Sequence, residues 1–467
     1  MLGARMSSQQ AANKSFGIPY GYPADWSSRK LRDVSLKIGS GATPTGGQAG
    51  YLPKRQKWAL VRSQNVLDRQ FDETGLAYIS DEQAASLQGV ALREGDVLLN
   101  ITGDGVTFAR SCQIPESALP AVVNQHVSII RSNPEMVDSG YVLAYLTHPA
   151  IKSYIEGFNA GGSRRAITKA HIESFEIPIP PLDEQRAVAM ILGTLDEKIE
   201  LNRRMNETLE AMARAIFKSW FVDFDPVHAK ASGEPEESIC QRLRLTPDLL
   251  ALFPGRFQDS VIGEVPLGWR VQSLPEIIEV NPIRQLKKGV TAPYLDMANV
   301  PINTSRVADV TQRKFGSGSK FVNGDTLLAR ITPCLENGKT AFVDFLDDGQ
   351  LGSGSTEFIV LRPKPPMPVP FAYFLCRQPE FRSFAIGHMA GTSGRQRVPN
   401  DCFSNYLLPI ATKEILAAFG KISTVALSMV AAKDNEAKGL SQLRNAALPK
   451  LMSGEIETID VERPRLV

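Results

Sequence analysis

Cysteine is scarce in this sequence, and its spacing excludes several classes of protein. Five cysteines occur in 467 residues, and no two of them form a C-x-x-C pair. An odd number without regular spacing excludes a small secreted scaffold held by disulfides and argues against structural zinc. We therefore expect a protein of a reducing compartment, the cytoplasm, that is stabilised by apolar cores.

Membrane segments and a strong charge of one sign are also missing. We find no apolar run that would span a bilayer, and the first residues lack the apolar segment of a signal peptide. Lysine and arginine total 52 and acidic residues 50, a formal net charge of +2. This balance allows a nucleic-acid partner without indicating one, so any basic site has to be local.

Catalytic motifs are absent as well. The sequence has no Walker pair and no Asn/Asp-Pro-Pro-Tyr/Phe motif, so neither ATP hydrolysis nor amino-methyl transfer is predicted. Asp183, Asp196 and Lys198 mimic a nuclease spacing, but all three fall on a predicted helix, where they would be solvated. No histidine has another four residues away, which leaves a metal site with little support. We predict a non-catalytic chain that binds no cofactor of its own.

Residues 181–226 carry the clearest pattern in the chain. Apolar side chains recur there at alternating steps of four and three, a spacing typical of a coiled coil. The seam comprises Val188, Leu192, Leu195, Ile199, Leu209, Ala213, Ile216 and Trp220, with Asn202 and Asn206 between them. With Asp183 as its predicted N-cap, a helix to Phe221 would be roughly 55 Å long.

The chain also repeats itself after about 230 residues. The run Gly95-Asp96-Val97-Leu98-Leu99 returns as Gly324-Asp325-Thr326-Leu327-Leu328. A second helical pattern follows the second copy, with Thr412 as its expected N-cap. Its predicted seam is Ile415, Phe419, Ile422, Ala426, Met429, Lys433, Glu436, Leu440, Leu443 and Ala447. A repeat of this length indicates a duplicated domain rather than a solenoid.

These patterns predict an α+β fold of two similar strand-rich domains, each followed by a long helix. Within the first domain we expect strands at 58–62, 95–101 and 127–131 in one curved sheet, and a helix at 140–156. The predicted divisions are a disordered lead-in (1–17), a first domain (18–180), a central helix (181–226), a linker with one short helix near 239–252 (227–264), a second domain (265–410), a distal helix (411–452) and a tail (453–467).

Two basic loops rich in glycine and hydroxyl groups occupy matching places in the repeats. The first contains Gly161, Gly162, Ser163, Arg164, Arg165 and Lys169, and the second contains Thr392, Ser393, Arg395 and Arg397. Such residues suit phosphate, because arginine neutralises it and hydroxyls donate short hydrogen bonds. Either loop alone is better explained as a solvated surface loop. Their matching positions favour phosphate contact.

Further candidates for DNA contact are side chains of the kinds that hydrogen-bond to bases or phosphates. In the first domain they are Ser40, Thr43, Thr45, Arg62, Gln64 and Asn65, and in the second they are Asn281, Arg284, Arg330 and Thr332. For any single one of them, a structural polar role is the stronger interpretation. We take them together as a hypothesis about where the bases are contacted.

Three motifs around the first helix resemble one known family. They are Pro180-Pro181-Leu182-Asp183-Glu184-Gln185-Arg186, then Lys218-Ser219-Trp220-Phe221-Val222-Asp223-Phe224-Asp225-Pro226, and Gly263-Glu264-Val265-Pro266-Leu267-Gly268-Trp269. With the repeat, they make the chain resemble the specificity subunits of Type I restriction-modification systems. The resemblance extends from about residue 22 to about residue 455.

The resemblance implies two target-recognition domains separated by two long helices, which form an antiparallel coiled coil in a pseudo-twofold repeat. Each domain would bind half of a split site in double-stranded DNA. The implied partners are two adenine-N6 methyltransferase subunits, which bring S-adenosylmethionine, and motor-endonuclease subunits, which bring ATP and magnesium. Trp220, Phe221 and Phe224 are the candidates for a subunit interface.

The same organisation agrees with split recognition on physical grounds. Two unequal domains on a rigid spacer form a pseudo-dimer, and dimers bind half-sites at a fixed separation. A span on the order of 50 Å corresponds to roughly 15 base pairs. The alternative is an adaptor whose duplicated domains bind proteins, which the near-neutral charge favours. The paired basic loops and only four tryptophans oppose it.

Overall fold

The computed structural model describes residues 18–103, 106–157, 165–392 and 394–457. The chain forms two compact units. Unit 1 comprises residues 1–201 and 437–467, and unit 2 comprises residues 202–436.

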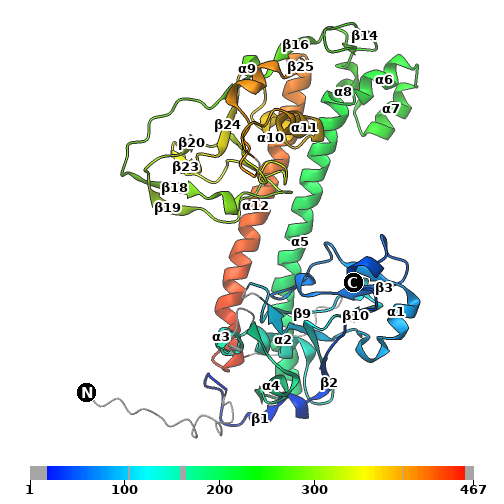
Figure 1. The fold of residues 1–467 in the computed structure, drawn as a ribbon, viewed down its shortest axis with the longest axis vertical. Helices are drawn as coiled ribbons and strands as arrows, with labels where there is room; N and C mark the ends of the chain where they lie inside the picture. Colours follow the sequence, from blue (N-terminus) through cyan, green and yellow to red (C-terminus); the bar gives the residue numbers. More distant parts are fainter. Residues whose placement is uncertain (1–17, 104–105, 158–164, 393, 458–467) are drawn as a thin grey trace. The chain divides into compact units, whose positions relative to one another are not determined.

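Two helices of 40 residues each, α5 (Leu182–Phe221) and α12 (Lys413–Met452), contribute to both units (Figure 1). In unit 1, Leu192 near the start of α5 shares a core with Leu448 near the end of α12. In unit 2, the ring centroid of Phe217 near the end of α5 lies 5.6 Å from that of Phe419 in α12. The two helices therefore run antiparallel, as predicted.

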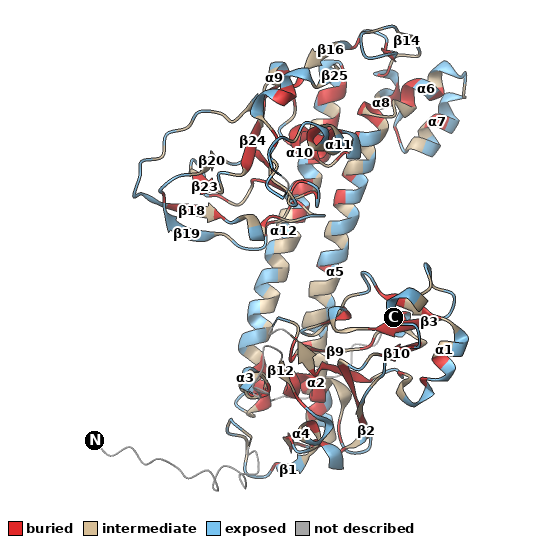
Figure 2. Cartoon of the chain, in the orientation of Figure 1, coloured by how far each residue is buried: buried red, intermediate tan, exposed pale blue. Residues whose placement is uncertain are grey.

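The predicted seam of α5 is confirmed, whereas that of α12 is wrong in part. Every predicted seam residue of α5 is buried or half-buried (Figure 2). In α12, Met429 and Leu443 are 42% and 57% exposed, while Leu427 and Val430 are buried. The apolar face of α12 is shifted by one residue there. Asp183 is also not an N-cap, because α5 begins at Leu182 and Asp183 lies in its first turn, with a salt bridge to Arg186.

Unit 1 contains two main sheets that share an apolar cluster, to which Val61 and Ile129 belong. The first is antiparallel and has the order β2 (Ser35–Ser40), β11 (Val127–Ser132), β7 (Val97–Asn100) and β9 (Ser111–Gln113). The second has the order β10 (Ala121–Val123), β3 (Trp58–Val61) and β6 (Ala77–Ile79), with β10 parallel to β3. The prediction of one curved sheet is therefore wrong, although the three expected strands are present.

The expected helix at 140–156 is two helices, α2 (Ser139–Thr147) and α3 (Pro149–Gly157). Proline lacks a backbone donor and fits the first position of a helix, so Pro149 begins a new one. The single helix expected in the linker is likewise divided, here into α7 (Glu236–Leu243) and α8 (Pro247–Ala251) after α6 (Asp225–Ala231). Pro247 again stands at the first helical position.

Unit 2 repeats the strand pairing of unit 1. One antiparallel sheet has the order β17 (Ile278–Val280), β24 (Phe358–Pro363), β21 (Thr326–Ala329) and β22 (Thr340–Phe342). The other has the order β19 (Thr311–Lys314), β18 (Thr291–Leu295), β23 (Gly352–Gly354) and β20 (Ser319–Phe321), with β18 parallel to β23. Both units also pair their first and last strands, β1 (Ser27–Lys30) with β13 (Glu176–Ile179) and β16 (Arg270–Ser273) with β25 (Leu407–Ile410). The predicted fold of two similar α+β domains with two long helices is confirmed.

By length and composition alone, α12 is apolar enough to cross a membrane. The expectation that no stretch of the chain meets this criterion is therefore wrong. Core helices of folded domains meet it too, and Ile415, Phe419 and Leu427 of α12 are buried in the core of unit 2.

Candidate nucleic-acid interface

In unit 1, a chain of polar contacts joins the predicted hydroxyl-rich loop to the end of β7. The Thr43 hydroxyl donates a hydrogen bond to Gln125 Oε1. Gln125 Nε2 lies 3.2 Å from His126 Nε2, and His126 Nδ1 lies 2.6 Å from Thr102 Oγ1. These four side chains come from three separate loops or strands. Thr43 and Gln125 are exposed and Thr102 and His126 are half-buried, so the four side chains form a polar surface.

Glycine at position 41 allows the loop that contains Thr43 to lie close to the backbone of residues 123–124. The Gly41 backbone N–H donates to the Asn124 carbonyl at 3.1 Å. A Cβ atom at position 41 would lie 1.7 Å from the Val123 carbonyl oxygen, so another residue would force the loop away. Ser40 and Thr45, the other candidates in this loop, have exposed side chains.

The first basic loop enters the same surface. Strand β12 (Arg165–Ala166) pairs with β8 (Thr102–Gly103). This pairing places Arg165 opposite Gly103, next to Thr102 of the polar surface. Lys169 is exposed at the start of α4 (Lys169–Glu173), and its Nζ lies 3.4 Å from Glu173 Oε1. Four more predicted site residues, Gly161, Gly162, Ser163 and Arg164, lie outside the described residues.

In unit 2, the second basic loop pairs with residues 331–332, which follow β21 as residues 101–102 follow β7 in unit 1. Gln396 and Thr332 exchange two hydrogen bonds of 3.1 Å, from the Thr332 N–H to the Gln396 carbonyl and from the Gln396 N–H to Thr332 Oγ1. Ile331 forms an isolated bridge with Arg397. The repeats therefore bring Thr102 and Thr332 beside a basic segment in the same way. Thr392 and Arg395 are exposed, and Ser393 lies outside the described residues.

Arg397 is bound by an acidic neighbour. Its Nε lies 3.0 Å from both carboxylate oxygens of Glu357, and its Nη2 lies 2.7 Å from Oε1. These hydrogen bonds and the attraction of the carboxylate raise the pKa of Arg397. Its charge is partly balanced, so the exposed Arg395, for which no ion pair is found among the described residues, offers the more available cation.

Asn65 and Asn281 are corrections to the predicted set. Asn65 is fully buried, where its side chain accepts from the Arg62 N–H at 3.1 Å and donates to the Asp72 carbonyl at 2.8 Å. Asn281 has a φ of 54° and accepts from the Val360 N–H at 2.9 Å. Both amides satisfy backbone groups where the chain leaves regular structure, so neither is placed to contact a base.

Two predicted arginines also have structural roles. Arg284 pairs at 2.7 Å with Asp325, whose side chain is wholly buried, and donates to the Lys320 carbonyl. Arg330 donates to the Val398 carbonyl at 2.5 Å. Their guanidinium groups are engaged inside unit 2, and we no longer place them among the residues that contact bases.

Arg62 and Gln64 are intermediate between the candidates that have structural roles and those that remain exposed. Arg62 Nη2 donates to the Gly75 carbonyl at 2.6 Å, and its guanidinium lies over the ring of Tyr51. Gln64 is exposed and reaches the same carbonyl at 3.3 Å. A part of each side chain therefore remains available to a ligand.

Sequence reasoning missed Thr102, Gln125 and His126. The signal was their position in the repeat, because residues 124–126 precede β11 just as residues 355–357 precede β24. A polar turn at the same point of both copies, next to each basic loop, could have drawn attention to them.

Two of the three aromatic candidates for a subunit interface, Trp220 and Phe221, are wrong, whereas the half-buried Phe224 stays a prediction. Trp220 and Phe221 are 3% and 7% exposed, and both lie in the core of unit 2. The ring of Phe224 is centred 5.6 Å from that of Trp269. These rings stabilise unit 2 internally, which the helical spacing alone could not distinguish from binding to another subunit. Within the described ranges, no group of three His, Cys, Asp or Glu side chains could hold a metal ion.

Comparison with known proteins agrees with this fold. Residues 23–211 match the family described as Type I restriction modification DNA specificity domain. The chain is 23% identical to the Type I restriction enzyme HindI specificity subunit of Haemophilus influenzae, over 93% of this chain and 100% of that relative. It is 30% identical to the EcoEI specificity subunit of Escherichia coli over 175 residues, 35% of this chain and 29% of that relative.

A solved structure has the same architecture. The S subunit of the Type-I restriction-modification system from M. genitalium superimposes with a TM-score of 0.53 at 14% identity. The match covers 91% of this chain and 96% of that one. Residues 23–211 thus belong to the Type I restriction modification DNA specificity domain family, and the whole chain is similar in sequence and fold to Type I specificity subunits.

Proposed function

We propose that this chain is the sequence-specific DNA-binding subunit of a Type I restriction-modification complex. Each unit binds one half of an asymmetric site in double-stranded DNA, and the helix pair sets a fixed gap between the halves. Binding directs adenine-N6 methylation and ATP-dependent restriction by partner subunits, while this chain itself performs no catalysis.

One observation carries the proposal more than any other. In both units, a threonine that follows a central strand, Thr102 after β7 or Thr332 after β21, lies beside a basic segment containing Arg165 or Arg395 and Arg397. Arginine and threonine side chains are suited to phosphate contacts. The surrounding loops differ between the units, which supports two unrelated half-sites rather than a palindrome.

The partners follow from the resemblance and complete the proposal. Two adenine methyltransferase subunits supply S-adenosylmethionine chemistry, and motor-endonuclease subunits supply ATP- and magnesium-dependent cleavage. The chain binds no cofactor of its own and acts in the cytoplasm, where its DNA lies. No membrane partner is included.

An adaptor that binds proteins through its duplicated domains is the second candidate. The favouring observation is the near-equality of acidic and basic residues, with a net charge of +2. It is weaker because the polar surfaces at Thr102 and Thr332 are local and basic, and local charge is what phosphate contact requires.

Single-molecule methylation sequencing tests the proposal directly. The gene is expressed with its cognate methyltransferase gene, and the methylated motifs are compared with those of a strain that lacks only this gene. Loss of a bipartite adenine-methylated motif on deletion is expected. If every methylated motif persists while the methyltransferase is active, the adaptor function is favoured instead.

A further inference from the structure

The edge strand β19 of unit 2 presents an unused polar surface. All four of its residues, Thr311–Lys314, are exposed, and β18 is its neighbour on one side only (Figure 1). Gln312, Arg313 and Lys314 are all exposed, with Arg313 on one face of the strand and Gln312 and Lys314 on the other. Within the described part of the chain, no hydrogen bond or ion pair is found for these three side chains. Charged side chains such as these protect an edge strand from pairing with another strand, and they also leave cations available to a ligand.

Arg313 is held in position by an aromatic ring. Its guanidinium carbon lies 4.7 Å from the centroid of the Tyr294 ring. Tyr294 pairs with Thr311 across the two strands, so Arg313 is its diagonal neighbour on the same face. A stacked guanidinium keeps its planar fork of donors free while losing less entropy on binding.

A polar pocket of about 320 Å³ adjoins Arg313. Hydroxyl groups and cations line it, and none of its lining residues is acidic; among them are Arg313, Lys314, Ser317, Ser355 and Thr356. The next residue along the chain is Glu357, which holds Arg397 of the second basic loop. The pocket therefore continues the candidate interface of unit 2 rather than forming a separate site.

The corresponding strand of unit 1, β6, is covered by other parts of the unit. Strand β6 pairs with β3 as β19 pairs with β18, yet Ala77 and Ile79 of β6 are buried against Ala84 of α1 (Asp81–Ala85). Two copies of one sheet have thus diverged at this strand, from a covered surface in unit 1 to an exposed polar surface in unit 2. Divergence at a matching position is expected where two half-sites differ in sequence.

We propose that β19 is the base-contacting element of unit 2, with Arg313 donating paired hydrogen bonds to O6 and N7 of one guanine in the major groove. Strands can occupy that groove, and arginine to guanine is the commonest specific contact. Lys314 contacts the adjacent phosphate. This assignment rests on the proposed function and replaces Asn281 and Arg284 as the specificity residues of unit 2.

Methylation sequencing of three variants, each assembled with the cognate methyltransferase, tests the assignment. Arg313→Ala removes the contact, and Arg313→Lys keeps the charge but loses the two-pronged geometry. Arg270→Ala, an exposed arginine on β16, is the matched control. Relaxation at one guanine of one half-site is expected in both Arg313 variants, with roughly tenfold or greater loss of discrimination there. The other half-site and the Arg270→Ala motif should match those of the wild type.

Arg313→Lys decides the outcome if Arg313→Ala methylates nothing. Relaxation at a single guanine position in Arg313→Lys supports the assignment. Any other pattern in that variant overturns it, including an unchanged motif, which would make Arg313 a phosphate contact. If the wild-type complex itself methylates no bipartite motif, the proposed function fails, and the assignment fails with it.

Discussion

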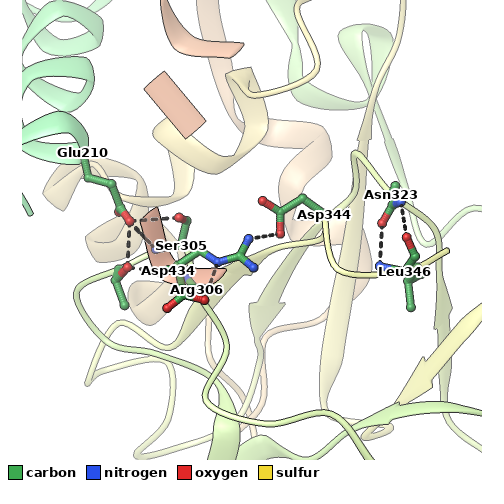
Figure 3. A network of polar contacts seen from close by, with 8 residues as sticks. Glu210, Ser305, Arg306, Asn323, Asp344, Leu346 and Asp434 are labelled. Atoms are coloured by element: carbon green, nitrogen blue, oxygen red, sulfur yellow. Dashed lines mark hydrogen bonds and ion pairs between the residues drawn. The ribbon is translucent and has the colours of Figure 1, made fainter. Parts of the chain in front are cut away.

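Glu210 accepts hydrogen bonds from both the backbone N–H and the hydroxyl of Ser305, at 2.8 and 2.9 Å (Figure 3). The carboxylate belongs to α5 and is 1% exposed, and the Thr304 hydroxyl and the Tyr373 phenol also donate to it. The residue after Ser305, Arg306, forms ion pairs with Asp344 and with Asp434, which belongs to α12. This network attaches the second domain to the helical segments of unit 2.

Glu210→Ala should destabilise unit 2 by about 3 kcal/mol or more, since it leaves several buried donors unsatisfied. Hydrogen exchange should quicken at residues 304–305, and the melting temperature of unit 2 should fall. Glu207→Ala, which removes an exposed partner of Arg203 on the same helix, should cost less than about 1 kcal/mol. Equal effects of the two substitutions would refute the role of the network.

Asp96→Asn should destabilise unit 1 by about 3 kcal/mol, because it leaves the half-buried guanidinium of Arg131 without its counter-charge. Asp96 is wholly buried and holds Arg131 through two contacts of 2.7 Å. In the copy, the buried Asp325 holds Arg362 and Arg284. Denaturation followed by hydrogen exchange should show Asp96→Asn loosening unit 1 and Asp325→Asn loosening unit 2. Destabilisation of both units by either substitution would contradict this prediction.

His148 should make unit 1 less stable in mild acid. Burial lowers the pKa of His148 to about 4, from an ordinary value of 6.5. Its Nδ1 accepts from the Ala150 N–H at 3.2 Å, so the folded state favours the neutral ring. Below pH 6.5 the unfolded chain takes up a proton that the folded chain refuses, and stability is lost as the pH falls towards 4.

His148→Asn keeps an acceptor for the Ala150 N–H and removes this titration. Thermal melts between pH 7 and 4 should therefore fall less steeply in the variant, by roughly 1–3 kcal/mol over the range. His388→Asn, at an exposed position in unit 2, should leave the profile unchanged. Parallel profiles for His148→Asn and the wild type would show that His148 is protonated in the fold.

Replacing Arg165 and Arg395 with alanine should weaken binding of the assembled complex to every DNA sequence. Each lost phosphate contact reduces the steepness of log affinity against log salt by about 0.9. The slope of the double variant should therefore be shallower by roughly 1.8. Binding titrations at several salt concentrations measure this slope. Lys421→Ala, an exposed lysine of α12, serves as the control. An unchanged slope in the double variant would remove both arginines from the interface.

The large features of the fold were predictable because they leave a periodic or repeated signal. The coiled-coil spacing of α5 reflects packing on one face, and the return of Gly95-Asp96 as Gly324-Asp325 reflects duplication. Their buried aspartates, each bound to an arginine, explain why this run is alike in both copies. Helix ends were less predictable, since single prolines such as Pro149 divide a continuous apolar pattern.

Individual site residues were far less predictable. The donors and acceptors that suit a base edge also suit a buried backbone group, and Asn65 and Arg284 serve the second purpose. Arg313 was missed because nothing in a run of polar residues says that its strand lies at an open edge. Only the pairing of strands distinguishes β19 from its covered counterpart β6.

The central claim is that each unit specifies one half of the DNA site, and a domain exchange tests it most directly. Residues 270–410 are replaced by the matching segment of another specificity subunit, and the methylated motif of the assembled complex is sequenced. One half of the motif should change while the other half and the gap remain those of the wild type. A motif in which both halves change, or neither does, would contradict the claim.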